Sequence, residues 1–334
     1  MISAYCRTFV LSAAVLLLAL AHGGCGTANF NLFSDSTDPL TEHTLEGTGG
    51  GKILVIPVQG NISDSSKRGF ARSRPSLVQE VVSRLKKAEK DKKVGAVVLQ
   101  VDSPGGTVTA SDMLYHEIAA FRERANVPVV AALMKTATSG AYYISLPADY
   151  IMAHPTTVTG STGVIFLRPK VSGLISKIGV EVRVSKSGKL KDMGSPFRPD
   201  TAEEQEILQG MIDEFARRFI GLVTAHRGPG EAALATIATA RVFLAEEARE
   251  LGLVDGIGYL DDALAMARQL GGLGEDARVV VYRRRSYPDD TLYNTAAVQG
   301  GTGDLHLVDL GLAASAGSVE AGFYYLWLPA VSAE

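Results

Sequence analysis

The sequence predicts an α/β fold in which parallel strands alternate with helices. Strand-like apolar runs occur at 52–58, 94–101 and 127–133, and the last two suit strands buried on both faces. Apolar residues at helical spacing lie between these runs, in 77–88 and 111–124. Strands that alternate with helices in this way are typical of parallel β-α-β units.

The composition is that of an ordinary globular protein with room for one large domain or two small ones. The 334 residues are 46% hydrophobic and 21% charged, and the formal net charge is −3. No basic excess indicates nucleic acid, so no nucleic-acid partner is expected. Both cysteines, Cys6 and Cys25, lie in the N-terminal region, so no disulfide framework holds the fold.

Residues 1–25 are predicted to be an export signal. Arg7 makes the start of the chain positive, and residues 9–21 form an apolar run that only Ser12 interrupts. This run is shorter than the ~20 residues that a membrane-spanning helix needs. Cleavage could follow Ala21, which ends an Ala-x-Ala pattern, or it could precede Cys25; an uncleaved anchor is a third alternative.

The stretch His22-Gly23-Gly24-Cys25 resembles a bacterial lipoprotein box, in which the cysteine becomes the lipidated N-terminus. His22 departs from the aliphatic residue that is usual at its position. Cys25 is thus a candidate lipidation site, and the alternative is an unlipidated signal with an incidental cysteine. Residues 26–51 have little apolar periodicity and end in a glycine-rich stretch, which predicts a flexible linker and a fold that begins at Lys52.

A glycine pair follows the strand predicted at 94–101, in the sequence Asp102-Ser103-Pro104-Gly105-Gly106. A strand that runs through glycines into a helix leaves backbone N–H groups free to point at a ligand. The pair is therefore a candidate oxyanion hole. A tight turn is the more common use of such glycines.

Ser139 lies where the strand predicted at 127–133 gives way to a helix. Unpaired N–H groups at a helix start carry partial positive charge, so a serine oxygen there can attack a carbonyl while nearby amides receive the developing negative charge. The ordinary alternative is that Ser139 is an N-cap, as most serines before helices are. This stretch alone favours the cap.

Ser161 is a second serine in a glycine-rich setting, between Gly160 and Gly163. Glycines at this spacing indicate a backbone that bends or approaches another group closely. Ser161 could be a second nucleophile, an orienting hydroxyl or a turn serine, and the turn serine is the usual answer.

A lysine-rich loop follows two short predicted elements, a helix at 171–178 and a strand at 180–184. The loop contains Lys186, Lys189 and Lys191, and such a segment is ordinarily a solvated surface.

The remainder of the chain is predicted to form two amphipathic helices, at 201–225 and 260–270, and a final strand at 279–282. Residues 283–334 are predicted to be an extension that ends in an aromatic cluster at 322–329, which contains the only tryptophan. This cluster could dock on a neighbouring subunit, insert at a membrane interface or pack as a strand on its own domain. Packing within an assembly is the interpretation we favour.

Two kinds of side chain could deprotonate Ser139. His116, His154 and His226 lie within the predicted fold, but none stands in a recognisable triad motif, and no G-x-S-x-G sequence is present. A lysine is the alternative base, and it must be neutral to accept a proton. An ordinary lysine is only about 0.04% neutral at pH 7, so a lysine base must be largely desolvated.

Four motifs in a fixed order carry a resemblance to a known family. They are Asp102-Ser103-Pro104-Gly105-Gly106, Ser139-Gly140-Ala141-Tyr142-Tyr143-Ile144-Ser145, Thr159-Gly160-Ser161-Thr162-Gly163-Val164 and Ser187-Gly188-Lys189-Leu190-Lys191-Asp192. Together they resemble the signal peptide peptidase A (protease IV) family of membrane-associated serine peptidases. The likeness covers roughly residues 52–270.

The resemblance implies a Ser-Lys dyad. Ser139 matches the family nucleophile and Lys191 matches its general base, which leaves Lys186 and Lys189 as loop lysines. No metal or cofactor is implied.

The resemblance also assigns supporting roles at the site. Ser161 matches the hydroxyl that hydrogen-bonds the base lysine, and the amides of Gly106 and Gly140 fit the oxyanion-hole positions.

The implied fold is similar to that of Clp protease and crotonase enzymes. It consists of repeated β-β-α units and forms a single catalytic domain, predicted here at 52–282. Family members with one such domain form ring-shaped homo-oligomers in which serine and lysine can come from neighbouring subunits.

The expected function is therefore that of a serine endopeptidase in the bacterial cell envelope. The N-terminus would tether the chain to the membrane, with the catalytic domain on the outer side of the cytoplasmic membrane. Its substrates would be remnant signal peptides or other unstructured membrane-proximal peptides. The alternatives are a non-catalytic envelope scaffold of the same fold and a crotonase-like acyl-CoA enzyme; export and the Ser139-Lys191 match argue against the latter.

Overall fold

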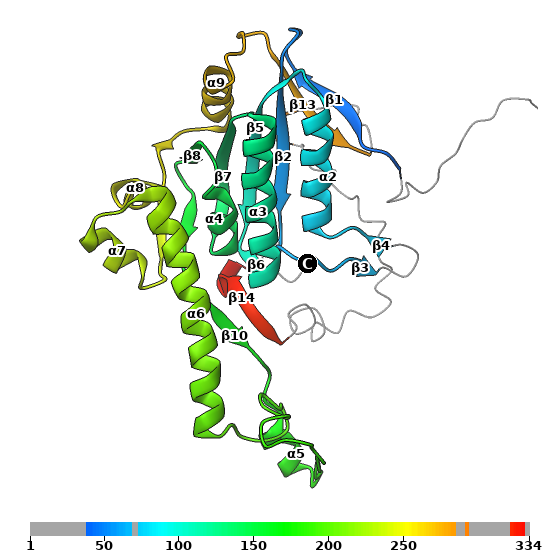
Figure 1. Ribbon diagram of the computed structural model, residues 1–334, viewed down its shortest axis with the longest axis vertical. Helices are drawn as coiled ribbons and strands as arrows, with labels where there is room; N and C mark the ends of the chain where they lie inside the picture. The colour runs from blue at the N-terminus through cyan, green and yellow to red at the C-terminus, as the bar shows by residue number, and fades with distance from the viewer. Residues whose placement is uncertain (1–37, 69–72, 285–290, 294–320, 331–334) are drawn as a thin grey trace, which may run out of the picture. The chain divides into compact units, whose positions relative to one another are not determined.

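A nine-stranded sheet is the centre of the described chain, which comprises residues 38–68, 73–284, 291–293 and 321–330 of the computed structural model (Figure 1). Its strands are β1 (Thr41–Glu46), β2 (Lys52–Gln59), β5 (Val94–Ser103), β7 (Val129–Thr138), β8 (Tyr150–Ala153), β9 (Val158–Gly160), β11 (Val242–Leu244), β12 (Gly256–Ile257) and β13 (Arg278–Arg283). The order is β1-β13-β2-β5-β7-β8-β12, and β9 pairs with the end of β7 and with β11. In this order, every pair of neighbouring strands from β13 to β12 is parallel. β1 pairs antiparallel with β13, and β11 pairs antiparallel with β9.

Short polar side chains mark where the longer helices begin. Ser76 accepts a hydrogen bond from the Gln79 amide at the start of α2, and Thr201 and Glu204 form a reciprocal capping box at the start of α6. The helices of the described residues are α2 (Leu77–Lys90), α3 (Val108–Ala125), α4 (Gly140–Ser145), α5 (Ser172–Lys177), α6 (Ala202–Arg227), α7 (Glu231–Ile237), α8 (Ala245–Glu250), α9 (Leu260–Leu270) and a 3-10 turn, η1 (Leu328–Ala330).

Side chains on the central strands alternate between two apolar layers. In β2, Leu54 and Ile56 pack with residues of α2, α3 and α4, while Ile53 and Val55 pack with residues of α9. All four side chains are fully buried. A sheet that is apolar on both faces and covered by helices is typical of parallel α/β proteins, so the predicted fold class is confirmed.

The elements follow one another as repeated β-β-α units. β5 is followed by the short strand β6 (Gly105–Thr107) and then by α3. β8 is followed in the same way by β9, and α6 is the next long helix after them. This succession agrees with the expected Clp protease/crotonase-like architecture.

A second, three-stranded sheet has the order β10-β14-β6, with β10 (Ile165–Leu167) and β14 (Gly322–Leu326). β14, drawn in red in Figure 1, pairs antiparallel with both of its neighbours. The aromatic C-terminal cluster therefore packs as a strand on its own domain, because β6 and β10 both offer it a strand edge. A short ribbon of β3 (Lys67–Arg68) and β4 (Ser73–Arg74) forms a further antiparallel pair.

The prediction of a flexible linker at 26–51 is wrong in its last part, because Thr41–Glu46 form β1 and pair with β13. This edge strand is only partly buried, so its sequence lacks the apolar run that marks the central strands. Ion pairs help to hold it. Glu42 accepts a hydrogen bond from the Lys52 ammonium at 2.6 Å and lies 3.4 Å from the Arg278 guanidinium.

The predicted strand at 180–184 is also wrong. This segment pairs with no strand of the described residues, and Val180, Val182 and Val184 are each exposed. Alternating valines favour an extended backbone, but a strand also needs a neighbouring edge to pair with.

Within the described ranges, no helix combines the length and the apolar character needed to cross a bilayer. The predicted signal sequence at 1–25, including Cys25, lies outside the described residues.

Candidate active site

Ser139 occupies a sharp turn between β7 and α4. Its backbone has φ 55° and ψ −117°, a conformation that is unfavourable for a residue with a Cβ atom. The Ser139 amide donates to the Gly160 carbonyl at 2.7 Å, and the Ser139 carbonyl accepts from the Tyr143 amide at 2.9 Å. These two bonds hold the turn from both sides.

The Ser139 side chain does not act as a helix cap. It makes no capping hydrogen bond, although capping is the role that its sequence context favours. The residue is 1% exposed, and its Oγ atom has no hydrogen-bond partner in the described chain. Buried hydroxyls without a partner are rare, and catalytic roles are one of the established reasons for them.

The two glycines assigned to the oxyanion hole lie together beside this turn. A Cβ atom added to Gly140 would lie 3.2 Å from the Gly106 amide nitrogen. One added to Gly106 would lie 1.9 Å from the Ile62 carbonyl oxygen, so a larger residue cannot replace Gly106 without backbone movement. Gly105, with φ +103°, bends the chain between β5 and β6.

Ser161 lies at the end of β9, next to the carbonyl that holds Ser139. Its φ of 52° is positive, like that of Ser139, and its amide donates to the Arg241 carbonyl at 2.9 Å. Because Gly160 pairs with Thr138 in the sheet, the structure places Ser161 and Ser139 on adjacent strand ends.

Lys191 lies elsewhere in the chain, on the segment between β10 and α6. We call this segment, residues 168–200, the arm. Figure 1 shows α5, which belongs to the arm, at the N-terminal end of α6 and away from the main sheet. Lys191 is exposed there, and the described chain does not bring its ammonium to Ser139, whose Oγ atom is unbonded.

The other two loop lysines are both ion-paired. The Lys186 ammonium lies 2.6 Å from a carboxylate oxygen of Asp192, and Lys189 pairs with Glu203. Among the described residues, no carboxylate pairs with Lys191. The three lysines occupy the same loop of the sequence, but the structure gives a carboxylate partner to Lys186 and Lys189 and, among the described residues, none to Lys191.

Arg198 links α6 to the loop that contains Lys191. Its guanidinium bonds both carboxylate oxygens of Asp192, at 2.9 Å each, and also pairs with the buried Glu204. Hydrogen bonds from Arg198 lower the pKa of both carboxyl groups. The sequence shows these residues only as ordinary charged positions, so this cluster was not predicted.

An aromatic cluster surrounds Tyr143 of α4, the helix that begins directly after Ser139. Tyr143 of α4 packs against Tyr325 of β14 with ring centroids 5.0 Å apart, and against Phe219 of α6 at 4.9 Å. Burial raises the pKa of Tyr143, whose hydroxyl donates to Asp112 at 2.6 Å. Arg218 bonds the same Asp112 oxygen, which ties α3, α4 and α6 together.

None of the three candidate histidines bonds Ser139. His226 bonds the Tyr115 hydroxyl at 2.8 Å, and His154 bonds Thr156 at 2.9 Å. His116 lines a separate cavity.

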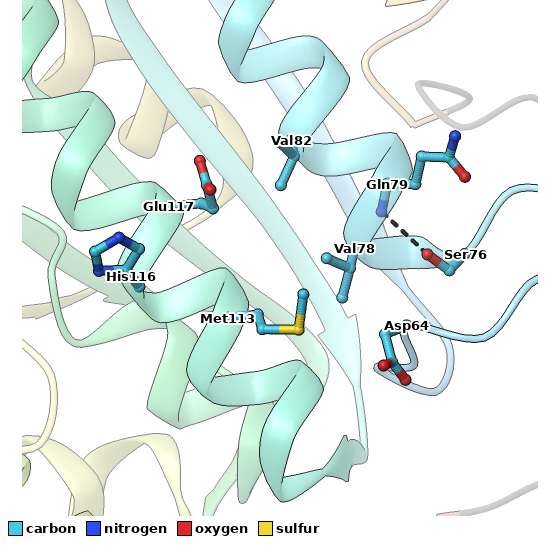
Figure 2. Close-up of a pocket in the computed structure, with 8 residues that line it drawn as sticks. All are labelled: Asp64, Ser76, Val78, Gln79, Val82, Met113, His116 and Glu117. Atoms are coloured by element: carbon cyan, nitrogen blue, oxygen red, sulfur yellow. Dashed lines mark hydrogen bonds between the residues drawn. The ribbon is translucent and has the colours of Figure 1, made fainter.

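That cavity, of about 350 Å³, lies between α2 and α3 (Figure 2). Its apolar floor is formed by Val78, Val82 and Met113, with His116 and Glu117 on the α3 side. A second cavity, of about 300 Å³, is lined by residues near the ends of β2, β5 and β7. Neither cavity is lined by Ser139, Ser161 or Lys191, so neither is the candidate active site.

Comparisons with known proteins identify the family of the chain. The model of peptidase family S49 matches residues 121–274. The Enterococcus faecium protein named "Putative signal peptide peptidase SppA" is 37% identical over 248 residues, which cover 74% of this chain and 72% of that protein. Protease 4 of Salmonella typhi is 38% identical over 226 residues, which cover 67% of this chain and 35% of that protein.

Among solved structures, a membrane-bound stomatin-specific protease in complex with a substrate peptide matches 73% of this chain and 96% of its own, with a TM-score of 0.41 and 16% identity. The resemblance found in the sequence is confirmed by the family match and by the identity to relatives over most of the chain. The chain belongs to peptidase family S49, and it is a serine endopeptidase.

Proposed function

We propose that this endopeptidase uses Ser139 as nucleophile and Lys191 of a neighbouring subunit as general base. The observation that carries the proposal is the state of Ser139. Its Oγ atom is buried and unbonded, on a strained turn beside the Gly106 and Gly140 amides. A hydroxyl in such a position is prepared to accept a partner that the described residues of one subunit do not supply.

The pattern of ion pairs supports Lys191 as that partner. A lysine held by a carboxylate is stabilised in its charged form and is a poor base. Lys186 and Lys189 are held in this way, whereas no carboxylate of the described ranges pairs with Lys191. Lys191 is also exposed, so a second subunit can cover it and favour the neutral form that catalysis requires.

The arm carries the apolar surface that such an assembly needs. Large apolar side chains are exposed along it, namely Leu174, Ile178, Val180, Val182, Val184 and Phe197. A patch of this kind on one segment is typical of an interaction surface. We therefore assign the arm to contacts between subunits of a ring-shaped homo-oligomer.

The chemistry follows from these positions. The Ser139 Oγ atom attacks the scissile carbonyl carbon and gives its proton to Lys191, while the Gly106 and Gly140 amides bind the oxyanion. The C–N bond then breaks, and the leaving amine takes the proton from Lys191. Water, deprotonated by Lys191, then attacks the acyl-enzyme, the ester C–O bond breaks, and Lys191 returns the proton to the Ser139 Oγ atom. Ser161 orients Lys191 through its hydroxyl.

The substrates that we propose are remnant signal peptides and other unstructured peptides near the membrane. The predicted export signal and the candidate lipidation site at Cys25 would place the catalytic domain on the outer side of a bacterial cytoplasmic membrane. The relative from Enterococcus faecium, which carries the words signal peptide peptidase in its name, supports this substrate class.

The test uses the full chain, an unstructured apolar peptide and three variants. Ser139→Ala and Lys191→Ala should each lower kcat by about 10³-fold or more, because each removes a reacting group. Lys189→Ala is the matched control and should stay close to wild type. All variants are first checked for equal assembly by light scattering.

Mixing the two inactive variants tests whether the dyad spans subunits. Mixed assemblies contain some sites with an intact Ser139 facing an intact Lys191, so part of the activity should return. No recovery would place the dyad within one subunit. Full activity of Lys191→Ala would overturn Lys191 as the base and direct attention to His116 and His154.

A further inference from the structure

Four exposed lysines lie at the C-terminal end of α2 and in the turn that leads to β5. Residues 84–93 include six basic and two acidic side chains, although the whole chain has a formal net charge of −3. Lys86, Lys90, Lys92 and Lys93 are each exposed. We call these four residues the lysine surface.

No carboxylate of the described residues pairs with the lysine surface, because the nearby acidic groups are bound to other cations. Glu89 pairs with Arg124 of α3 at 3.1 Å, and Asp91 binds the Lys52 ammonium at 2.6 Å. The positive charge of the lysine surface is therefore available to an anionic partner outside the chain.

Helix stability explains only part of this surface. Lysines in the last turn of a helix interact favourably with the helix dipole, and Lys87 and Lys90 occupy that turn in α2. Lys92 and Lys93 lie beyond Asp91, the C-cap, and so lie outside this effect. A solvated surface is the ordinary role of such a charge run, but the entry point of the chain indicates a more specific one.

The N-terminal segment enters the fold beside the lysine surface. The Lys87 ammonium donates to the Leu40 carbonyl at 2.8 Å, directly before β1 begins. Glu42 of β1 and Asp91 both bind the Lys52 ammonium at 2.6 Å, so β1 is tied to the turn that follows α2. A membrane that holds the N-terminus is thereby brought close to the four lysines.

From these observations we propose that the lysine surface binds the anionic lipid headgroups of the membrane to which the N-terminus is anchored. The inference rests on the membrane attachment proposed above and not on the Ser139-Lys191 dyad. Lysines beside a membrane anchor are attracted by negatively charged lipids, and a basic patch strengthens the binding that a lipid anchor provides.

This contact also orients the catalytic domain. The lysine surface precedes β5, whereas the Ser139 turn follows β7, and β5 and β7 are parallel neighbours. The two sites therefore lie at opposite ends of the sheet, separated by about 33 Å, the length of the ten-residue strand β5. Because the Ser139 end is held away from the bilayer, the substrates are peptides that have left the headgroup region.

Vesicle binding by the full chain tests the proposal. The probes are vesicles of phosphatidylcholine alone and of an equal mixture of phosphatidylcholine and the anionic lipid phosphatidylglycerol. The measured quantity is the ratio of the two partition coefficients, obtained by sedimentation. Every variant keeps residues 1–25, so the contribution of the export signal is the same in all of them.

Lys90→Gln combined with Lys93→Gln should lower this ratio about 25-fold, because each lysine near an anionic surface strengthens binding about fivefold. The matched control combines Arg217→Gln with Arg249→Gln, which removes the same charge from two exposed ion pairs elsewhere. It should change the ratio by less than about twofold, because these arginines lie outside the lysine surface.

Equal binding of the wild type to both kinds of vesicle would overturn the proposal. An equal loss in the two double variants would also overturn it, because net charge alone would then explain the binding. The Ser139→Ala chain should prefer the anionic vesicles as the wild type does, so a failure of the proposed catalytic mechanism is distinguishable from a failure of this inference.

Lysine acetylation, followed by mass spectrometry, tests the orientation. Anionic vesicles should protect Lys92 and Lys93 from a water-soluble acetylating reagent, while the exposed Lys177 of α5 stays reactive. Equal protection of all three lysines would mean that no face of the domain is preferred, which would refute the proposed orientation.

Discussion

The two residues of the proposed dyad lie in regions of opposite construction. Ser139 is held by backbone hydrogen bonds between buried strand ends, and neighbouring glycines leave no room for side chains. Lys191 lies on an exposed arm that surface ion pairs attach to α6. Ser139 is thus fixed by the covalent chain and the core, whereas the position of Lys191 depends on ion pairs of the arm that solvent can reach.

Glycine substitutions are expected to show the largest difference in stability between the surroundings of Ser139 and the arm. Gly106→Ala places a methyl group 1.9 Å from the Ile62 carbonyl and should lower the free energy of unfolding by about 3 kcal/mol. Gly173→Ala on the arm meets no atom within 4 Å and should change it by less than about 1 kcal/mol. Urea unfolding at one fixed protein concentration measures both, and equal effects would remove the contrast.

Arg198→Ala tests whether the ion-pair cluster positions the base. The loop around Lys191 loses its link to Glu204, so peptidase activity should fall about tenfold, the effect of a positioning group worth ~1.4 kcal/mol. The melting temperature is measured alongside, because the variant also leaves the buried Glu204 carboxylate without its cation. Arg183→Ala, at an exposed ion pair with Glu181 on the same arm, is the matched control. Activity that falls equally in both variants would refute a specific role for Arg198.

Ser139→Gly tests whether the turn at Ser139 stores backbone strain. Glycine adopts φ 55°, ψ −117° without strain, so this variant should be more stable than Ser139→Ala by about 1 kcal/mol, while both are inactive. Thermal unfolding of the two variants at equal concentration provides the measurement. Equal stability would mean that the turn stores no strain.

The smallest expected effect is a pH dependence confined to the arm. Asp192 and Glu204 have lowered pKa values in the folded chain, so their stabilising contribution is complete above the ordinary values of about 4 and is lost as the pH falls through the lowered values. Pepsin should therefore cut within 168–200 much faster at pH 2 than at pH 4, before the sheet is attacked. Arg198→Gln should be cut rapidly at both pH values. Uniform cleavage along the chain at pH 2 would contradict a local opening.

The sequence was sufficient for the parts of the fold that depend on local pattern. Apolar runs identified the central strands, and the glycine pair and Ser139 could be placed at strand ends, because these signals lie within a few residues of each other. The structure brings Gly106, Gly140 and Ser161 to Ser139 as expected.

Long-range pairing could not be predicted in this way. β1 and β14 are strands because they pair with strand edges that are distant in the sequence. Their own sequences do not indicate which edges these are. The segment at 180–184 shows the reverse case, since its valines favour a strand but no strand edge in the described part of the chain pairs with it. The role of Arg198 likewise depends on three-dimensional neighbours that its sequence position does not reveal.

The pairing of β1 with β13 limits how far the enzyme can reach. A linker that ended at Lys52 would extend up to about 97 Å from Cys25, whereas a chain that enters the sheet at Thr41 leaves at most about 58 Å. If Cys25 is the lipid anchor, Thr41 stays within about 58 Å of the membrane surface, and the catalytic domain stays correspondingly close to it. Peptides released from the bilayer surface then meet the enzyme at high local concentration, and folded proteins farther from the membrane remain out of its range.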